Sequence, residues 1–130
     1  MACLDTDIMV ALLRGEEKAI NKIAALEFIE PLSTTPLNAT ELFKGAYRSK
    51  FSQENVIQVQ NLLSNLKILD YDLESARQSA QIIEKMRKKG KTVGDMDSII
   101  AGIAIANNES LVTRNVKHFK RIPGLKVIKW

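Results

Sequence analysis

The sequence VGDMDSIIAGIAIA, residues 93–106, decides the fold of this chain. After Ser98 it contains no polar side chain for the rest of the segment. A helix that is apolar on every face is buried on all sides, so this segment predicts a central helix. Gly94 and Asp95 have the character of a helix start, with Asp95 as the expected N-cap, and Asp97 falls in the first turn.

Two carboxylates at the start of a buried helix need a reason. One interpretation is an N-cap together with an acid that matches the positive end of the helix dipole, which contributes about 0.3–1 kcal/mol. The other interpretation is a metal site to which this helix contributes ligands. Both interpretations remain open on this segment alone, and the rest of the chain has to decide between them.

The length and composition of the chain predict one globular domain over residues 1–130. The net charge of +4 is a mild basic bias, which permits nucleic-acid binding without establishing it. The single cysteine, Cys3, allows no internal disulfide, so a reducing compartment is expected. No secretion leader and no apolar run of membrane-spanning length is present. We therefore expect a cytoplasmic protein with no membrane association.

Short apolar runs alternate with segments of helical periodicity along the whole chain. We expect strands at residues 2–4, 32–37, 67–71, 111–113 and 126–128, and helices at 8–13, 16–28, 38–47, 52–66, 72–89 and 94–106, with a turn or short helix at 115–119. This alternation predicts an α/β three-layer sandwich, with a mostly parallel central sheet flanked by helices. In such sheets, ligands bind beyond the carboxyl ends of the strands.

Several helix boundaries are predicted from capping patterns. Asn38 with Glu41 three residues later has the spacing of a capping box, while Ser52 and Asp72 are expected to cap the two following helices. Pro36 should lie at a strand end. For the helix after Asp72, the side chains expected to face the core are Ala76, Ala80, Ile83 and Met86.

Acidic and polar residues follow the predicted strands or begin the predicted helices at one rim of the sheet: Asp5, Glu41, Asp95, Asp97, Thr113 and Asn115. Carboxylates that share a pocket repel one another and raise one another's pKa unless a cation lies between them. Oxygen ligands without cysteine or paired histidine suit Mg²⁺ or Mn²⁺. Each acid also has a simpler interpretation as a helix cap or dipole partner, but four independent caps on one rim is the less economical account.

The motifs in order are LDTD (4–7), TEL (40–42) followed by Gly45-Ala46, GDMD (94–97) with Ile100-Ala101, LVTRN (111–115) with Phe119, and PGL (123–125). Each motif is weak alone, but the ordered set, which runs from Asp5 to Trp130, resembles the PIN-domain ribonucleases. Within them, it is most similar to the VapC toxins of toxin–antitoxin pairs.

The resemblance implies Mg²⁺- or Mn²⁺-dependent endonucleolytic cleavage of RNA. The first acid of the family falls on Asp5, the second on Glu41 and the third on Asp97, with Asp95 as an accessory acid. The chain departs from the pattern at two positions. Asp7 stands where the family commonly has asparagine, and the fourth acidic position holds Asn115, which offers a second metal ion only a neutral oxygen.

Hydrolysis of a phosphodiester needs a water made nucleophilic by a metal and stabilisation of charge on the phosphate oxygens. We expect Asp5 and Asp97 to ligate the metal directly. Glu41 is expected to complete the metal site and to orient the water or act as general base. Thr6 and Thr113 either position these acids or only satisfy local backbone groups.

Basic side chains near the motifs are the candidates for binding RNA phosphates: Arg14, Lys44, Arg48, Arg114 and Lys117. Lys126 and Lys129 are interpreted as solvated surface, and the few aromatic residues argue against extensive base stacking. The early helices carry more apolar residues than one buried face needs: Leu12, Leu13, Phe43, Tyr47, Phe51, Ile57 and Leu62. These predict a homodimer surface or a groove for an antitoxin peptide, unless they belong to the core.

Alternative functions remain open at this point. The same resemblance covers an RNA-processing PIN nuclease outside a toxin–antitoxin pair. Asp5-Thr6-Asp7 after a strand also resembles the nucleophile motif of haloacid-dehalogenase-type phosphatases, although the expected later motifs are absent. A phosphoacceptor signalling domain would need an acceptor acid after a mid-chain strand, where Asp70 is the candidate, and an RNA-binding module would not need the acids.

Overall fold

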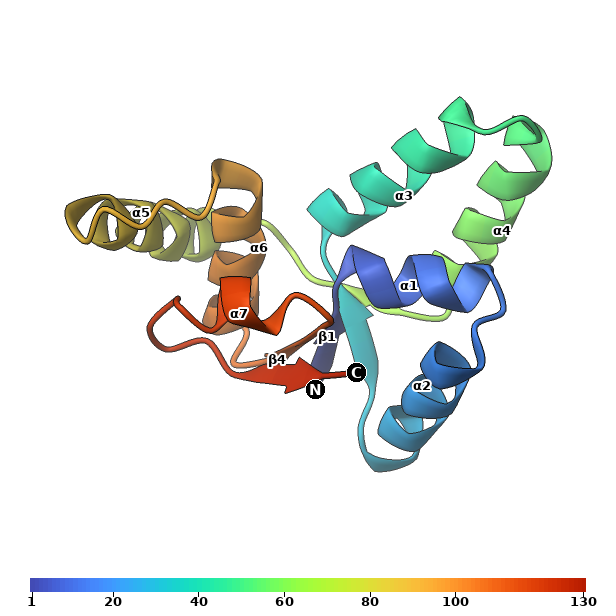
Figure 1. Cartoon of the computed structure of the whole chain (residues 1–130), viewed down its shortest axis with the longest axis horizontal. Coiled ribbons are helices and arrows are strands. Elements are labelled where there is room, and N and C mark those ends of the chain that lie inside the picture. Colours follow the sequence, from blue (N-terminus) through green and yellow to red (C-terminus); the bar gives the residue numbers. More distant parts are fainter.

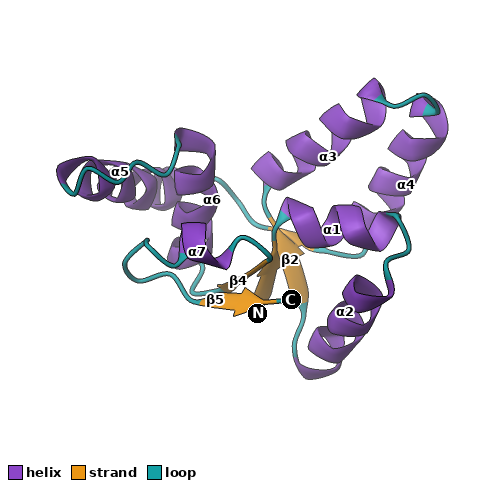
Figure 2. Cartoon of the chain, viewed as in Figure 1, coloured by secondary structure: helices purple, strands orange, loops and turns teal.

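The computed structural model describes residues 1–130 and has a five-stranded sheet between two groups of helices (Figures 1 and 2). The strands are β1 (Ala2–Leu4), β2 (Leu32–Thr34), β3 (Lys67–Ile68), β4 (Ser110–Thr113) and β5 (Val127–Lys129). The helices are α1 (Thr6–Leu13), α2 (Glu17–Ile29), α3 (Pro36–Arg48), α4 (Ser52–Ser64), α5 (Leu73–Lys88), α6 (Asp95–Ala106) and α7 (Val116–Phe119).

The strand order is β3-β2-β1-β4-β5, and every neighbouring pair is parallel. The chain adds β2 and β3 on one side of β1, then returns to place β4 and β5 on the other side. The direction of winding therefore reverses between β1 and β4, where Leu4 pairs with Val112. Loops diverge at such a point and leave a crevice at the carboxyl ends of the strands. The predicted α/β architecture is confirmed, and the sheet is parallel throughout.

The alternation of side chains along the strands divides the core into two layers. Leu4 and Val112 belong to a cluster with residues of α1–α4, whereas their neighbours Cys3 and Leu111 belong to a second cluster with α5–α7. Figure 1 shows the corresponding arrangement, with α1–α4 on one side of the sheet and α5–α7 on the other. The middle layer is thus covered on both faces, as a parallel sheet requires.

The α6 helix is the buried helix that its sequence predicts. Ile100, Ala101, Ile103 and Ala104 are fully buried. The predicted N-cap is wrong by one residue, because Gly94 occupies the cap position and Asp95 is the first helical residue. Gly94 has a φ of 95°, a conformation in which a side chain is strained, so glycine is favoured at this helix start.

The start of α3 also differs from the prediction. The helix begins at Pro36, and the hydroxyl of Thr35 caps it by accepting a hydrogen bond from the amide of Asn38. The strand before it is shorter than expected and ends at Thr34. Proline suits the first helical position because its missing N–H has no partner there in any case. Asn38 and Glu41 are therefore inside the helix and free for other contacts.

Three further local predictions are wrong. Phe51, and not Ser52, is the N-cap of α4 and makes no side-chain cap. The β3 strand is limited to two residues. In α5, which Asp72 does cap, Ser75, Ser79, Ile82 and Met86 are buried, whereas Ala80 and Ile83 are exposed. Ser79 faces the core because α6 approaches it most closely at Gly102, which leaves no room for a larger side chain. None of the helices has both the length and the apolar character to span a membrane.

Gly102 sets the distance between α5 and α6. A Cβ on Gly102 would lie 2.1 Å from Ser79 Oγ and 2.8 Å from its backbone nitrogen. We expect Gly102→Ala to destabilise the protein by about 1–3 kcal/mol, because the helices have to separate. Gly45→Ala is the matched control: Gly45 lies within α3 with nothing near its absent Cβ, so alanine there should raise stability by about 1 kcal/mol. Urea denaturation measures both, and equal effects would contradict this account of the α5–α6 packing.

Candidate active site

The carboxylate of Asp5 lies at the carboxyl end of β1, beside the end of β4. It is 8% exposed and has hydrogen-bond partners on both oxygens. Oδ1 accepts from the Thr6 amide at 2.9 Å and from Asn38 Nδ2 at 3.0 Å. Oδ2 accepts from the Thr113 hydroxyl at 2.7 Å. The acid is therefore held in one orientation by residues from α1, α3 and β4.

Burial raises the pKa of Asp5 to about 6, from an ordinary value of 3.8. Burial is the largest cause of this net rise, to which the negative charges of Asp7 and Asp97 also contribute, while the hydrogen bonds from Thr113 and the Thr6 amide reduce it. A buried carboxylate close to other acids is the electrostatic situation that a bound cation relieves. A perturbed acid at a crevice is also typical of functional sites.

Asn38 connects Asp5 to Glu41. Its side-chain oxygen accepts from the Thr35 hydroxyl at 2.6 Å, which fixes the orientation of the amide. Its Nδ2 donates to Asp5 and, at 3.0 Å, to the Thr6 hydroxyl. That hydroxyl in turn donates to Glu41 in a short hydrogen bond. Of the two interpretations left open for Thr6, its hydroxyl contacts agree with the one in which it positions an acid.

Asp97 is held by a histidine. Its Oδ2 lies 2.7 Å from His118 Nε2, and the other ring nitrogen, Nδ1, lies 3.0 Å from the guanidinium of Arg121. A guanidinium only donates, so Nδ1 is an acceptor, and the ring proton is on Nε2. The imidazole therefore donates to Asp97. His118 comes from α7, which places this acid between α6 and the segment after β4.

Asp7 has a structural role. Its Oδ2 accepts from the Arg114 amide at 2.9 Å and contacts the Thr113 hydroxyl at 3.0 Å. Its Oδ1 accepts from the indole of Trp130 at 2.9 Å. The Arg114 guanidinium stacks 4.0 Å from the centre of the same indole ring. Asp7 thus ties α1 to the ends of β4 and β5.

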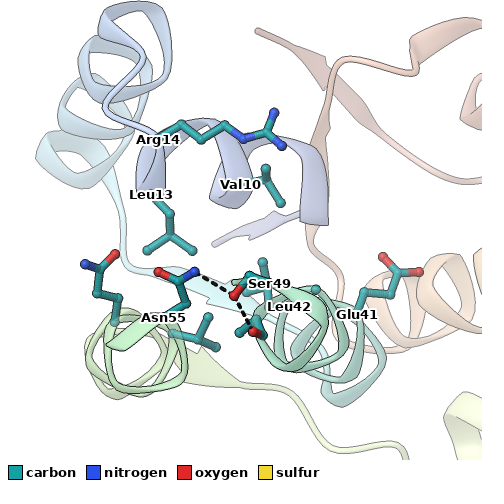
Figure 3. A pocket seen from close by; sticks show the side chains of 11 residues that line it. Val10, Leu13, Arg14, Glu41, Leu42, Ser49 and Asn55 are labelled. Carbon is teal, nitrogen blue, oxygen red and sulfur yellow. Dashed lines mark hydrogen bonds between the residues drawn. The ribbon is translucent and has the colours of Figure 1, made fainter. Parts of the chain in front are cut away.

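The remaining predicted residues are more scattered. Asp95 and Asn115 are exposed, and neither side chain forms a hydrogen bond. Thr113 is buried between Asp5 and Asp7. Arg14 and Glu41 both line a pocket of about 320 Å³ between α1, α3 and α4 (Figure 3). Arg114 lies against Trp130, whereas Lys44, Arg48 and Lys117 are exposed on the surface.

The donor set fits a hard divalent cation in its chemistry. Asp5, Asp97 and Glu41 offer only oxygen atoms, and the charges of Asp5 and Asp97 oppose each other. No three acidic, histidine or cysteine side chains are close enough to form a ready-made metal site. Two of the acids are instead paired within the protein, Asp97 with His118 and Glu41 with Thr6.

Comparison with known proteins agrees with this geometry. The family model described as PIN domain matches residues 2–125. The chain belongs to the PIN-domain family. The tRNA(fMet)-specific endonuclease VapC of Salmonella typhimurium is 31% identical over 127 residues, which cover 98% of this chain and 96% of that protein. Ribonuclease VapC2 of Rickettsia felis is 32% identical over 128 residues, with the same coverage.

Solved structures extend the similarity to three dimensions. The VapBC2 structure of Rickettsia felis, bound to a promoter DNA fragment, contains a chain with a TM-score of 0.92 and 31% identity, covering 99% of this PIN-domain chain and 98% of that one. The DNA-bound VapBC structure of Salmonella typhimurium contains a chain with a TM-score of 0.90 and 30% identity. The match covers 100% of this chain and 99% of that one. The resemblance to the VapC members of the PIN-domain family is confirmed, and the relatives support an RNA-cleaving nuclease of the toxin–antitoxin kind.

Three residues of the site were not predicted from the sequence: Asn38, His118 and Trp130. Asn38 was assigned to a helix cap because its spacing to Glu41 matched one. His118 had no partner in sequence, since Asp97 is on another element. Trp130 had no signal beyond its place after the last strand. A polar residue in the helix after a strand is the signal for Asn38, and an aromatic residue directly after a strand is the signal for Trp130, whereas His118 has no such signal.

The pKa of Asp5 leads to a pH-dependent stability. The rise from 3.8 to about 6 means that ionising Asp5 costs the folded, metal-free protein about 3 kcal/mol. Below about pH 4, the group is protonated in both states and the cost vanishes. Between about pH 4 and 6, Asp5 ionises only in the unfolded chain, so the free energy of unfolding falls as the pH rises.

Asp5→Asn should therefore stabilise the metal-free protein at pH 8 by up to about 3 kcal/mol, and this advantage should disappear below pH 4. Asparagine keeps the Oδ1 contacts, and its Nδ2 donates to Thr113. Asp72→Asn is the control of opposite sign, because hydrogen bonds from Ser75 lower the pKa of Asp72. Urea denaturation with a chelator present measures both, and an Asp5→Asn protein no more stable than the unmutated one at pH 8 would refute the account.

Proposed function

We propose that this PIN-domain chain is a Mg²⁺- or Mn²⁺-dependent endoribonuclease and the toxin of a toxin–antitoxin pair. The observation that carries the proposal is the buried Asp5, oriented by donors from three elements and facing the charge of Asp97. The VapC relatives, which are named as ribonucleases, support the choice of RNA as substrate. A nuclease from an RNA-processing route, with the same site, is the second candidate.

Asp5, Asp97 and Glu41 would hold the divalent ion. When bound, the ion supplies a nucleophilic water at neutral pH and neutralises charge on the phosphate. Thr113, Asn38 and the Thr6 amide hold Asp5 in place, and His118 does so for Asp97. Asn115, at the rim, contributes no charge, so we infer that one ion is firmly held in the absence of RNA.

Glu41 is the proposed group that orients the attacking water and accepts its proton. The carboxylate is half-buried and receives the Thr6 hydroxyl, which fixes one oxygen and leaves the other for the water. The same residue lines the pocket between α1, α3 and α4, where Arg14 provides the positive charge (Figure 3). We propose Arg14, Lys44, Arg48, Arg114 and Lys117 as phosphate contacts, with Arg114 already fixed by Trp130.

The proposed protein partners are a small antitoxin and a second copy of the chain. The structures of relatives are titled as VapBC complexes, which supports the antitoxin. Of the apolar residues in the early helices, Leu12, Leu13, Phe43 and Leu62 pack against the core. Tyr47, Phe51 and Ile57 are 67%, 60% and 55% exposed at the junction of α3 and α4. We propose this junction as the homodimer surface.

The unmutated protein should cut end-labelled tRNA or single-stranded RNA internally when Mg²⁺ or Mn²⁺ is added. Asp5→Asn and Asp97→Asn should each reduce the rate at least about 100-fold. Mutating a residue that only hydrogen-bonds to a metal ligand already lowers activity by up to about 100-fold, and these two acids are proposed to be ligands themselves. Asp70→Asn, a change at an exposed loop acid, is the control and should cut normally. Hydrolysis of a phosphate monoester without RNA cutting would favour the phosphatase alternative and overturn the proposal.

Self-association is tested by sedimentation. The protein should be dimeric at tens of micromolar, a concentration above ordinary dimer dissociation constants. Ile57→Lys should give monomers, because it buries a charge at the proposed surface. Leu73→Lys, at a residue that is 87% exposed on α5, is the matched control and should remain dimeric. A monomeric unmutated protein, or dimers of the Ile57→Lys variant, would rule out this surface.

A further inference from the structure

A second, basic pocket lies where α2 faces the end of β5. It has a volume of about 500 Å³, and six residues line it: Lys18, Asn21, Lys22, Ala25, Lys129 and Trp130. The four residues from α2 recur at intervals of three or four, so they form one face of that helix. The opposite face, with Ala19, Ile23 and Leu26, is buried. Figure 2 shows the carboxyl end of the chain next to the tip of β5.

The pocket is strongly cationic. Three ammonium groups surround it, no acidic side chain lines it, and none of its lysines takes part in the ion pairs of the structure. Lys18 lies in the first turn of α2, where the helix dipole disfavours a positive charge. Lys18 and Lys22 are also four residues apart, a spacing at which like charges destabilise a helix. This arrangement opposes helix stability, and an anionic ligand would relieve it.

The pocket is connected to the acid cluster through Trp130. The indole that lines the pocket donates to Asp7, and Asp7 shares the hydroxyl of Thr113 with Asp5. The guanidinium of Arg114 stacks on the same ring. Asp7, the acid on this route, has both carboxylate oxygens engaged by hydrogen bonds, and the exposed Arg114 provides a positive charge between Asp5 and the lysines.

We propose that Lys18, Lys22 and Lys129 form a phosphate-binding subsite for the RNA strand beside the scissile bond. The inference rests on the proposed nuclease function and adds the path of the substrate. Lysines bind phosphates as point charges, without the paired geometry of arginine. The indole is 4% exposed, so it offers no surface for base stacking. The subsite consequently binds the RNA backbone and does not read its sequence.

The sharpest test is the salt dependence of binding. A chelator prevents cleavage, and fluorescence anisotropy measures the affinity for a labelled single-stranded RNA between 50 and roughly 300 mM KCl, a range that covers the counterion-release regime. Lys18→Gln, Lys22→Gln and Lys129→Gln are combined in one variant. Its slope of log K against log salt should be shallower by about 2, because each lost phosphate contact on a single strand removes about 0.7. With metal, its kcat/KM for RNA should fall about tenfold or more.

The control variant combines Lys85→Gln, Lys88→Gln and Lys89→Gln at the carboxyl end of α5 and its C-cap, which changes the net charge equally. It should retain the slope and the cleavage of the unmutated protein. Equal slopes for the two variants would overturn the subsite. A labelled poly-glutamate peptide is the second probe, and lysine-dependent binding of that peptide with unchanged RNA binding would overturn it in favour of an acidic protein partner. If RNA binds with the expected slopes but is never cut, the nuclease proposal fails and the subsite stands.

Discussion

The structure depends on burying one carboxylate, that of Asp5, at the point where the winding of the sheet reverses. The β1 and β4 strands must be neighbours and parallel for Thr113 to reach it, and α3 must begin beside β2 for Asn38 to reach it. Burial alone raises the pKa of the acid, and the nearby charges of Asp7 and Asp97 raise it further. The fold accepts an electrostatic cost at this point, which a divalent cation would offset.

Asp7 has a structural role, unlike the acids that are proposed to hold the metal. It has a carboxylate next to the site, but hydrogen bonds from β4 and from Trp130 engage both of its oxygens. Trp130 in turn supports Arg114, so one structural acid orders the end of the edge strand and a candidate phosphate contact. The negative charge of Asp7 also raises the pKa of Asp5. Asp7 thus contributes to both the mechanical support and the electrostatics of the site.

The sequence was sufficient for the sheet, the buried α6 and the rim that carries the acids, because those depend on hydrophobic periodicity and strand ends. The sequence was not sufficient to place the start of a helix where two positions are possible, as in α3. At Pro36 the chain has both a strand-like run and a proline that can open a helix, and the cap at Thr35 decides for the earlier start. The inward face of α5 differs from the prediction because the close approach of Gly102 requires a small residue at Ser79, a constraint that comes from another helix.

Contacts between elements distant in sequence also determine the two charged sites, the acid cluster and the lysine pocket. Asp5, Glu41 and Asp97 are fixed by partners from other elements, and none of those partners is visible from local spacing. The lysines of α2 were unremarked for the same reason, since their common pocket exists only when β5 lies against the helix. The ionised Asp5 is only partly compensated by its hydrogen bonds, and none of the ion pairs of the structure compensates the Lys18–Lys22 pair. Such conflicts concentrate where a protein meets a ligand, and these two are complementary: a cation relieves one and an anion the other. A phosphate backbone accompanied by a divalent ion would satisfy both at once, so the proposed RNA substrate would account for the acid cluster and the basic pocket together.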